Sequence, residues 1–185
     1  PIQSFMCAAD EGLPWIKIGD VPADGKFITR TAQHVSPKGA AKSRRVRPGD
    51  FVLSNSMSLG RPYISKIEGC IHDGWLVLSD YDASFDSDYL YYLLRSGPIQ
   101  DEFRRRAGAG TVKNLNADIV KAIEVPVPPK EQQARTVKFL NAFDMLVNDP
   151  ASGLPAEMAA RRRQFEYYRD KLLAFAAKPT DKAVA

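Results

Sequence analysis

The chain divides at one proline-rich segment, Glu124-Val125-Pro126-Val127-Pro128-Pro129. Each proline disfavours the helical conformation in the residue before it, so the segment predicts a break between two differently built parts. Residues before it form short apolar runs separated by turn signals, whereas residues after it follow helical spacing. We therefore expect an α+β domain of mixed α/β structure over residues 1–128, a helical region over 129–178 and a tail over 179–185.

The first part contains apolar runs that have the composition of β-strands. Pro48-Gly49 suits the central positions of a type II turn before one of them. Ser87-Asp88 resembles a helix cap, Gly97-Pro98 a helix stop, and Asn116 the cap of a short turn. The expected strands are 15–18, 51–54, 63–67 and 75–78, and the expected helices are 89–95 and 99–107.

The second part predicts two helices. Pro129 suits the first position of a helix that runs to about residue 147, and a second helix is expected from Pro155 to about residue 177. Apolar residues of the second helix recur every seven positions, which predicts a coiled-coil-like hairpin whose apolar stripe is covered by self-association or by a partner. The alternative is a helix packed on its own domain. The candidate dimer or assembly residues are Met158, Phe165, Tyr168, Leu172 and Phe175.

The net charge of +4 hides a strongly uneven distribution of charge. Residues 26–66 hold nine cations and one acid, residues 67–103 hold eight acids and one cation, and residues 104–121 return to a charge of +4. If the two basic segments fold onto one face, that face attracts a polyanion. The pattern favours nucleic-acid binding, and the alternative is an ordinary solvated surface of mixed charge.

Signals of catalysis are missing from the sequence. It contains no GxSxG, GxxxxGK[ST] or HExxH motif, and its two Cys and two His lack the spacing of a metal site. The composition, 44% hydrophobic and 26% charged, is that of a globular protein, and no apolar run is long enough to cross a membrane. We expect a non-catalytic cytoplasmic protein that binds neither a metal nor a cofactor of its own.

Three polar, basic loops are the candidate DNA-binding elements. Lys and Arg neutralise phosphates, whereas Asn and Arg also make bidentate contacts to adenine and guanine edges. For each loop the alternative is a surface loop without a ligand. The candidate residues are Lys38, Lys42, Ser43, Arg44, Arg45 and Arg47, then Asn55 and Arg61, then Arg104, Arg105, Arg106, Lys113 and Asn114.

Three stretches resemble the specificity (S) subunits of type I restriction-modification systems. Residues 13–21 with 47–54 look like the opening of a target recognition domain. Gly110 to Asn116, followed by Val125-Pro126-Val127-Pro128-Pro129-Lys130-Glu131-Gln132-Gln133, is similar to its end and to the passage into a conserved helix. Residues 153–158 and 161–175 look like the family's conserved helical region. The resemblance covers roughly residues 13–177.

The resemblance implies a division of labour. A whole S subunit has two recognition domains, each of which reads half of a split double-stranded DNA site, separated by antiparallel helices. Modification subunits dock around those helices and bring S-adenosylmethionine, and the restriction subunit brings ATP- and Mg-dependent translocation and cleavage. By this resemblance the chain holds one recognition domain and one helical region, and the usual start of the recognition domain is missing or shortened before Leu13. It is therefore expected to be a half-subunit or a C-terminal fragment, and to form a homodimer through its helices.

Other functions remain open at this point. The chain would instead be a protein-binding helical adaptor if its globular part bound protein, or the recognition domain of a solitary DNA methyltransferase. A free-standing nucleic-acid enzyme is disfavoured because the sequence holds no catalytic set.

Overall fold

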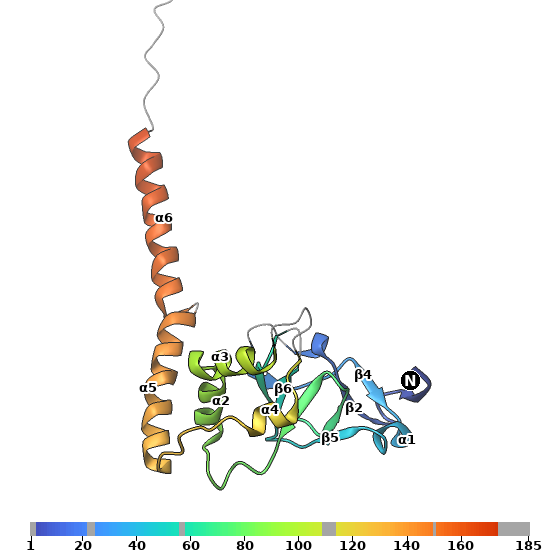
Figure 1. The fold of residues 1–185 in the computed structure, drawn as a ribbon. Coiled ribbons are helices and arrows are strands. Elements are labelled where there is room, and N and C mark those ends of the chain that lie inside the picture. The colour runs from blue at the N-terminus through green and yellow to red at the C-terminus, as the bar shows by residue number, and fades with distance from the viewer. Residues whose placement is uncertain (1–2, 22–24, 56–57, 109–113, 150, 174–185) are drawn as a thin grey trace, which may run out of the picture. The chain divides into compact units, whose positions relative to one another are not determined.

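A computed structural model of the 185-residue chain describes residues 3–21, 25–55, 58–108, 114–149 and 151–173. By its contacts the chain forms two compact units, Pro1–Val137 and Lys138–Ala185, which meet inside one helix. The first unit contains all the strands of the described residues (Figure 1). The domain boundary expected at residue 128 stays a prediction.

Strands of the first unit form two mixed sheets. One sheet has the order β1-β4-β2-β8-β5 and the other β3-β7-β6-β9. β2 runs parallel to β8 and β3 parallel to β7, while the remaining pairs are antiparallel. The strands are β1 (Met6–Cys7), β2 (Leu13–Ile16), β3 (Phe27–Ile28), β4 (Gln33–Val35), β5 (Arg44–Val46), β6 (Phe51–Ser54), β7 (Pro62–Ser65), β8 (Gly69–Ile71) and β9 (Trp75–Leu78).

Helices of very different length accompany the sheets. Within the described part of the chain, no helix is both long enough and apolar enough to span a bilayer. Together with the mixed sheets, the long C-terminal helix confirms the α+β fold class. The helices are η1 (Gln3–Phe5), η2 (Ile18–Asp20), α1 (Pro37–Ala40), α2 (Ser87–Arg95), α3 (Gly97–Arg106), α4 (Ala117–Lys121), α5 (Lys130–Asn148) and α6 (Leu154–Leu173).

The four-stranded sheet lies at the centre of the first unit. Successive side chains of a strand point to opposite faces, so Phe51 and Leu53 pack against α2 and α3 while Val52 packs against the five-stranded sheet. All four residues of β6 are buried because both faces of this sheet are covered. A third cluster, which includes Trp15 and Val35, fills the outer face of the five-stranded sheet near α1.

Four predicted boundaries need correction. The cap of α2 is Asp86, whose carboxylate accepts bonds from the backbone N–H of Asp88 and Tyr89, so Ser87 and Asp88 already belong to the helix. Gly97-Pro98 does not simply stop one helix but opens the next, because proline is tolerated in a first helical turn. β2 begins at Leu13 and ends at Ile16, and β7 ends at Ser65. Gly49 has a φ of 98°, as the predicted turn requires.

The beginning of α5 is fastened to the first unit by Gln133, which is fully buried. Its Oε1 accepts a hydrogen bond from the backbone N–H of Asp86 at 2.7 Å. Its Nε2 donates to the carbonyl oxygens of Ser84 at 2.9 Å and Pro128 at 2.8 Å. One amide side chain thus joins α5 to the loop before α2 and to the proline-rich segment.

In the second unit α6 continues along the direction of α5, and the two helices do not fold back into the expected hairpin (Figure 1). The N–H of Asp149 donates to Met145 and the N–H of Gly153 donates to Asp149, which continues the helical sense across the junction. Gly153 is buried, and a Cβ there would lie 2.6 Å from the carbonyl oxygen of Leu146. These backbones therefore approach each other closely at a position that only glycine can occupy without a shift.

Candidate nucleic-acid interface

The first basic loop lies around α1 and β5, at the edge of the five-stranded sheet. Lys38, Lys42 and Arg44 are exposed there. Ser43 instead donates its hydroxyl to the carbonyl oxygen of Gly39 at 2.9 Å, so this side chain holds the loop together. The structure therefore brings three of the predicted cations to one edge and gives the predicted serine a local role.

Arg45 and Arg47 are placed differently from Arg44. Arg45 is the next residue of β5 and projects to the other face, where its Nη1 lies 3.3 Å from Oε1 of Glu68. Arg47 lines a separate hollow of about 270 Å³ together with three acids, Asp50, Asp80 and Asp82. Structure thus separates Arg47 from the cations around Lys42, and the acidic neighbours weaken its attraction for phosphate.

The second loop contributes Asn55 and Arg61. Asn55 is half-buried, and its Nδ2 donates to the carbonyl oxygen of Asp73 at 2.7 Å. The guanidinium of Arg61 lies 5.5 Å from the ring centre of Tyr63. Arg61 also lines a hollow of about 350 Å³ with two further arginines, Arg95 and Arg104. Arg95 was missed from the sequence because it stands alone in an acidic stretch.

The third basic cluster is the last turn of α3. Arg104 pairs with Asp101 at 2.5 Å, and Arg105 and Arg106 both pair with Glu102, at 2.6 and 2.8 Å. Hydrogen bonds from Arg105 and Arg106 hold the pKa of the Glu102 carboxyl below its usual range. Two acids thus offset part of this cluster's charge.

The end of the third loop is tied to the second one. Lys113 lies outside the described residues, whereas Asn114 is exposed. The next residue, Leu115, is buried, and its N–H donates to the carbonyl oxygen of Asn55 at 2.7 Å. This bond brings the predicted second and third loops together, although about sixty residues separate them in sequence.

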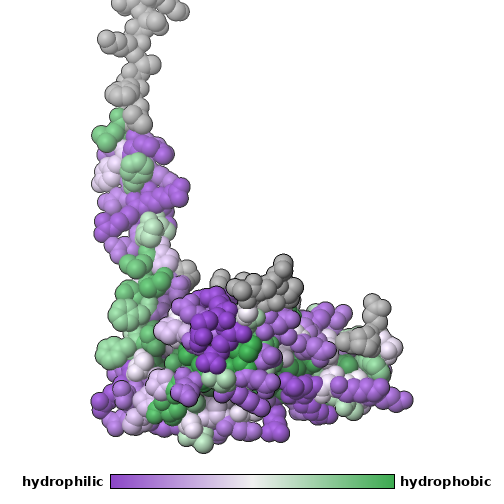
Figure 2. Space-filling model, in the orientation of Figure 1, coloured by the Kyte–Doolittle hydropathy of each residue, from purple (hydrophilic) through white to green (hydrophobic). Residues whose placement is uncertain are grey.

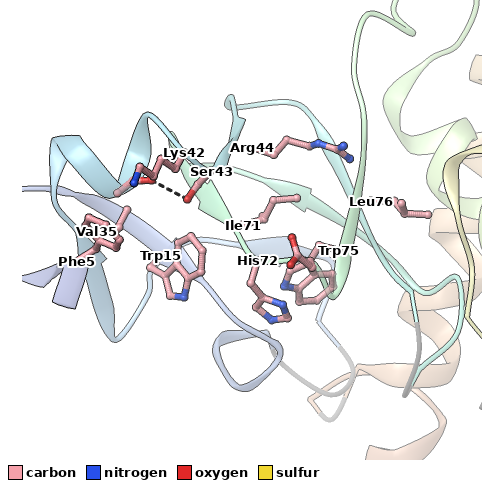
Figure 3. A pocket seen from close by; sticks show the side chains of 12 residues that line it. Phe5, Trp15, Val35, Lys42, Ser43, Arg44, Ile71, His72, Trp75 and Leu76 are labelled. Carbon is pink, nitrogen blue, oxygen red and sulfur yellow. Dashed lines mark hydrogen bonds between the residues drawn. The ribbon is translucent and has the colours of Figure 1, made fainter. Parts of the chain in front are cut away.

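A cleft of about 640 Å³ opens beside the first basic loop (Figure 3). Three predicted residues line it, namely Lys42, Ser43 and Arg44. His72 and Asp73, from the turn between β8 and β9, also line it and were not predicted. A polar turn between two buried strands was the available signal, but His72 was considered only as a metal ligand.

The described seam residues of the second unit are exposed. Met158, Phe165, Tyr168 and Leu172 have exposed fractions of 72%, 64%, 52% and 74%, and Phe175 lies outside the described residues. Figure 2 shows hydrophobic residues among the hydrophilic ones along α6. Phe139, Phe143 and Met145 of α5 are also exposed and were not among the predicted seam residues.

Known proteins with similar sequences form one group. The family model for the type I restriction modification DNA specificity domain matches residues 4–158. The Haemophilus influenzae type I specificity subunit S.HindORF215P is 30% identical over 178 residues, which are 94% of this chain and 44% of that protein. The Escherichia coli EcoR124I/EcoR124II specificity subunit is 33% identical over 87 residues, or 47% of this chain and 22% of that protein.

Solved structures show the same fold. A chain from a study of complex assembly in the type I R-M system has a TM-score of 0.64 at 21% identity and covers 93% of this chain and 39% of its own length. The HsdS subunit of Thermoanaerobacter tengcongensis has a TM-score of 0.61 at 22% identity, over 78% of this chain and 33% of its own. This chain spans less than half the length of these relatives. Because the family model matches most of its residues, the chain belongs to the specificity (S) subunits of type I restriction-modification systems.

Proposed function

We propose that this chain recognises one half of a split double-stranded DNA target and positions the methyltransferase subunits of a type I complex there, without catalysing a reaction itself. Membership of the family supports this role. The observation that carries it is the clustering of cations from three segments around two hollows of the first unit. In the cytoplasm, partner subunits supply S-adenosylmethionine for modification and ATP with Mg²⁺ for restriction, and the restriction subunit joins through the complex.

The cations divide this work between positioning and reading. Lys42 and Arg44 at one hollow, and Arg61, Arg95 and Arg104 at the other, contact phosphates and fix the register of the protein on the duplex. Base edges are read by side chains of the second loop, because arginine and asparagine make bidentate contacts with guanine and adenine. The bond from Asn55 Nδ2 to the carbonyl oxygen of Asp73 fixes the orientation of this amide and leaves its Oδ1 as an acceptor for a base.

Salt-dependent binding tests this assignment. Arg44→Gln and Arg61→Gln, each assembled with the modification subunits, are compared in DNA retardation at several salt concentrations. If each residue contacts one phosphate, each variant weakens binding and lowers the slope of log K against log salt by about 1. Lys121→Gln is the charge-matched control, because Lys121 is exposed on α4, away from both hollows.

Three other results would redirect the assignment. Unchanged slopes for both variants would remove these arginines from the phosphate contacts. Failure of the assembled complex to retard any duplex would favour a protein-binding helical adaptor. A complex that binds and methylates its target but joins no restriction subunit would favour the recognition domain of a solitary methyltransferase.

The proposed role includes a homodimer through the C-terminal helices. Exposed apolar side chains on α6 need another surface to cover them, and a second copy with the same stripe restores two half-site readers around a two-fold axis. Light scattering of the full chain should give twice the monomer mass at micromolar concentration. Phe165→Asp should give the monomer, whereas Gln164→Asp, at the neighbouring exposed position, should leave the dimer intact. A wild-type monomer would contradict the dimer.

A further inference from the structure

The cleft beside the first basic loop has two chemically different sides (Figure 3). Lys42 and Arg44 bring positive charge to one side, and His72 with Trp75 and Trp15 forms the other. The ring centre of His72 lies 6.4 Å from that of Trp15 and 6.3 Å from that of Trp75, so the imidazole stands between the two indoles. A volume of about 640 Å³ is in the range of small-molecule sites.

His72 presents a hydrogen-bond donor in a fixed orientation. Its Nδ1 accepts a bond from the backbone N–H of Gly74 at 2.7 Å, so in the neutral ring Nε2 carries the proton. Burial lowers the pKa of His72, Asp73 partly opposes this shift and Lys17 adds to it. The lowered pKa keeps the ring neutral near pH 7. Gly74 leaves room for this ring, because a Cβ there would lie 2.2 Å from Cε1 of His72.

A second donor at the cleft lacks a partner. Nε1 of Trp75 is buried without a hydrogen-bond partner among the described residues, and so is Oγ of Ser54, its neighbour across the β6–β9 pair. In Figure 3 the indole nitrogen of Trp75 lies on the side of the ring that faces His72. An unpartnered buried polar group destabilises the folded state, and such groups in native proteins call for an explanation.

Cations on one side, rings with N–H donors on the other and the exposed carboxylate of Asp73 match the parts of a nucleotide. The guanidinium of Arg44 complements a phosphate, aromatic side chains complement the face of a base, and Asp73 accepts from an exocyclic amine. We propose that this cleft binds one nucleotide outside a duplex stack, with the phosphate at Arg44 and the base against His72. Where the nucleotide is part of the target DNA, this site rests on the proposed DNA-recognition function.

Tryptophan fluorescence tests the site directly, because both tryptophans of the chain line the cleft. The full chain is titrated with dAMP, dGMP, dCMP and TMP. Separate titrations use the matching nucleosides, inorganic phosphate and a single strand of DNA five nucleotides long. We expect saturable quenching by at least one mononucleotide, about tenfold tighter than by its nucleoside because the nucleoside lacks the charged contact. No saturable quenching, or equal binding of nucleotide and nucleoside, would overturn the proposal.

The single strand identifies the source of the nucleotide. Tighter binding of the strand than of the mononucleotide assigns the site to DNA, because neighbouring phosphates add contacts. If the mononucleotide binds and the strand does not compete with it, the ligand is a free nucleotide. Quenching by inorganic phosphate to the same extent would reduce the site to an anion contact and overturn the role of the base.

Three variants separate binding from folding. His72→Leu removes the donor, Gly74→Ala pushes the His72 ring without removing any polar group, and Arg44→Gln changes an exposed side chain that the fold does not need. Each should weaken nucleotide binding about tenfold while circular dichroism stays native, and Lys121→Gln should bind as wild type. If either His72→Leu or Gly74→Ala fails to fold, Arg44→Gln still decides the result.

Trp75→Phe gives a readout that a structural role would not produce. This substitution removes the unpartnered N–H, so the free energy of unfolding should stay the same or rise, while nucleotide binding reported by Trp15 weakens. Equal nucleotide affinity in Trp75→Phe, His72→Leu and wild type would overturn the cleft site. If the assembled complex still selects its DNA in that case, only this inference fails, and the proposed function stands.

Discussion

The two compact units treat large apolar side chains in opposite ways. In the first unit, Phe51 and Phe103 are at most 1% exposed. In the second unit, Phe165 is 64% exposed and Leu172 is 74% exposed. Among the described residues of 138–173 only Gly153 is buried, and it carries no side chain. The first unit thus covers its own apolar surface, whereas the second leaves it exposed.

The origin of this difference is the number of layers. β6 of the first unit has α2 and α3 on one face and a second sheet on the other, so side chains on both faces of the strand lose contact with water. A helix without a second layer has only its backbone bonds and its side-chain pairs, and most helical stability in proteins comes from packing. The first unit should therefore fold alone, whereas the second unit should gain stability on association.

Paired phenylalanine substitutions give the largest expected contrast. Phe103→Ala removes a ring packed against the backbone of Gly60 and should lower the free energy of unfolding by about 3–5 kcal/mol. Phe165→Ala should change it by about 0.5 kcal/mol or less in the monomer. Urea unfolding of the full chain at low concentration, followed by circular dichroism, measures both. A similar loss for both variants would break the contrast, because it would mean that Phe165 is packed within its own chain.

Adjacent glutamines at the start of α5 give a contrast of the same kind. Gln133→Leu keeps the approximate size of the side chain but removes the three hydrogen bonds that this buried amide makes to the backbone of Ser84, Asp86 and Pro128, at a cost of about 2–4 kcal/mol. Gln132→Leu changes an exposed side chain and should be nearly neutral. Thermal unfolding of the two variants compares them. Equal melting temperatures would show that this buried amide does not fasten α5.

Sequence pattern predicted the elements whose residues carry a complete local signal. β6 and β9 match the expected ranges 51–54 and 75–78, because each is an apolar run bounded by turn residues. β1, β3, β5 and β8 have two or three residues each, too few to show a period. β8 is a strand because it pairs with β2 and β5, which lie far away in sequence, and no local pattern records such partners.

Prediction of the candidate site had the same limit. Charge clustering identified Lys42, Arg44 and Arg104, all of which line a hollow. It could not tell that β5 sends Arg44 and Arg45 to opposite faces, since that depends on an unpredicted strand. The sequence does not single out His72, because its orientation comes from the backbone of Gly74 and because Trp15, which is far away in sequence, lies on one side of its ring.

Polar side chains show the same difference between the two units, with smaller expected effects on stability. Asp86→Ala removes the cap of α2 and should cost about 1 kcal/mol, while Asp86→Asn, which still accepts from the same N–H groups, should cost less. Glu166→Gln in α6 breaks an exposed ion pair with Arg162 and should cost less than about 0.5 kcal/mol. Urea midpoints give all three values. A Glu166 effect as large as that of Asp86 would show that the ion pairs of α6 contribute more than solvent-exposed pairs usually do.

Thiol labelling reports the contrast with the least disturbance of the chain. The sequence has two cysteines, of which Cys7 is half-buried on β1 and Cys70 is buried on β8. Burial raises the pKa of the Cys70 thiol, Arg45 partly opposes this shift and Glu68 adds to it, so less of the reactive thiolate is present. Ala159→Cys adds an exposed reference thiol in the second unit. A chromogenic thiol reagent should react fastest at position 159, more slowly at Cys7, and at least about a hundredfold more slowly at Cys70, which reacts only when the core opens.

In urea above the unfolding midpoint the three rates should converge, because the protection of Cys70 belongs to the folded sheet. Fast labelling of Cys70 in the native protein would mean that the outer face of the five-stranded sheet opens locally, and the division between a closed first unit and an open second unit would then have to be drawn inside that sheet.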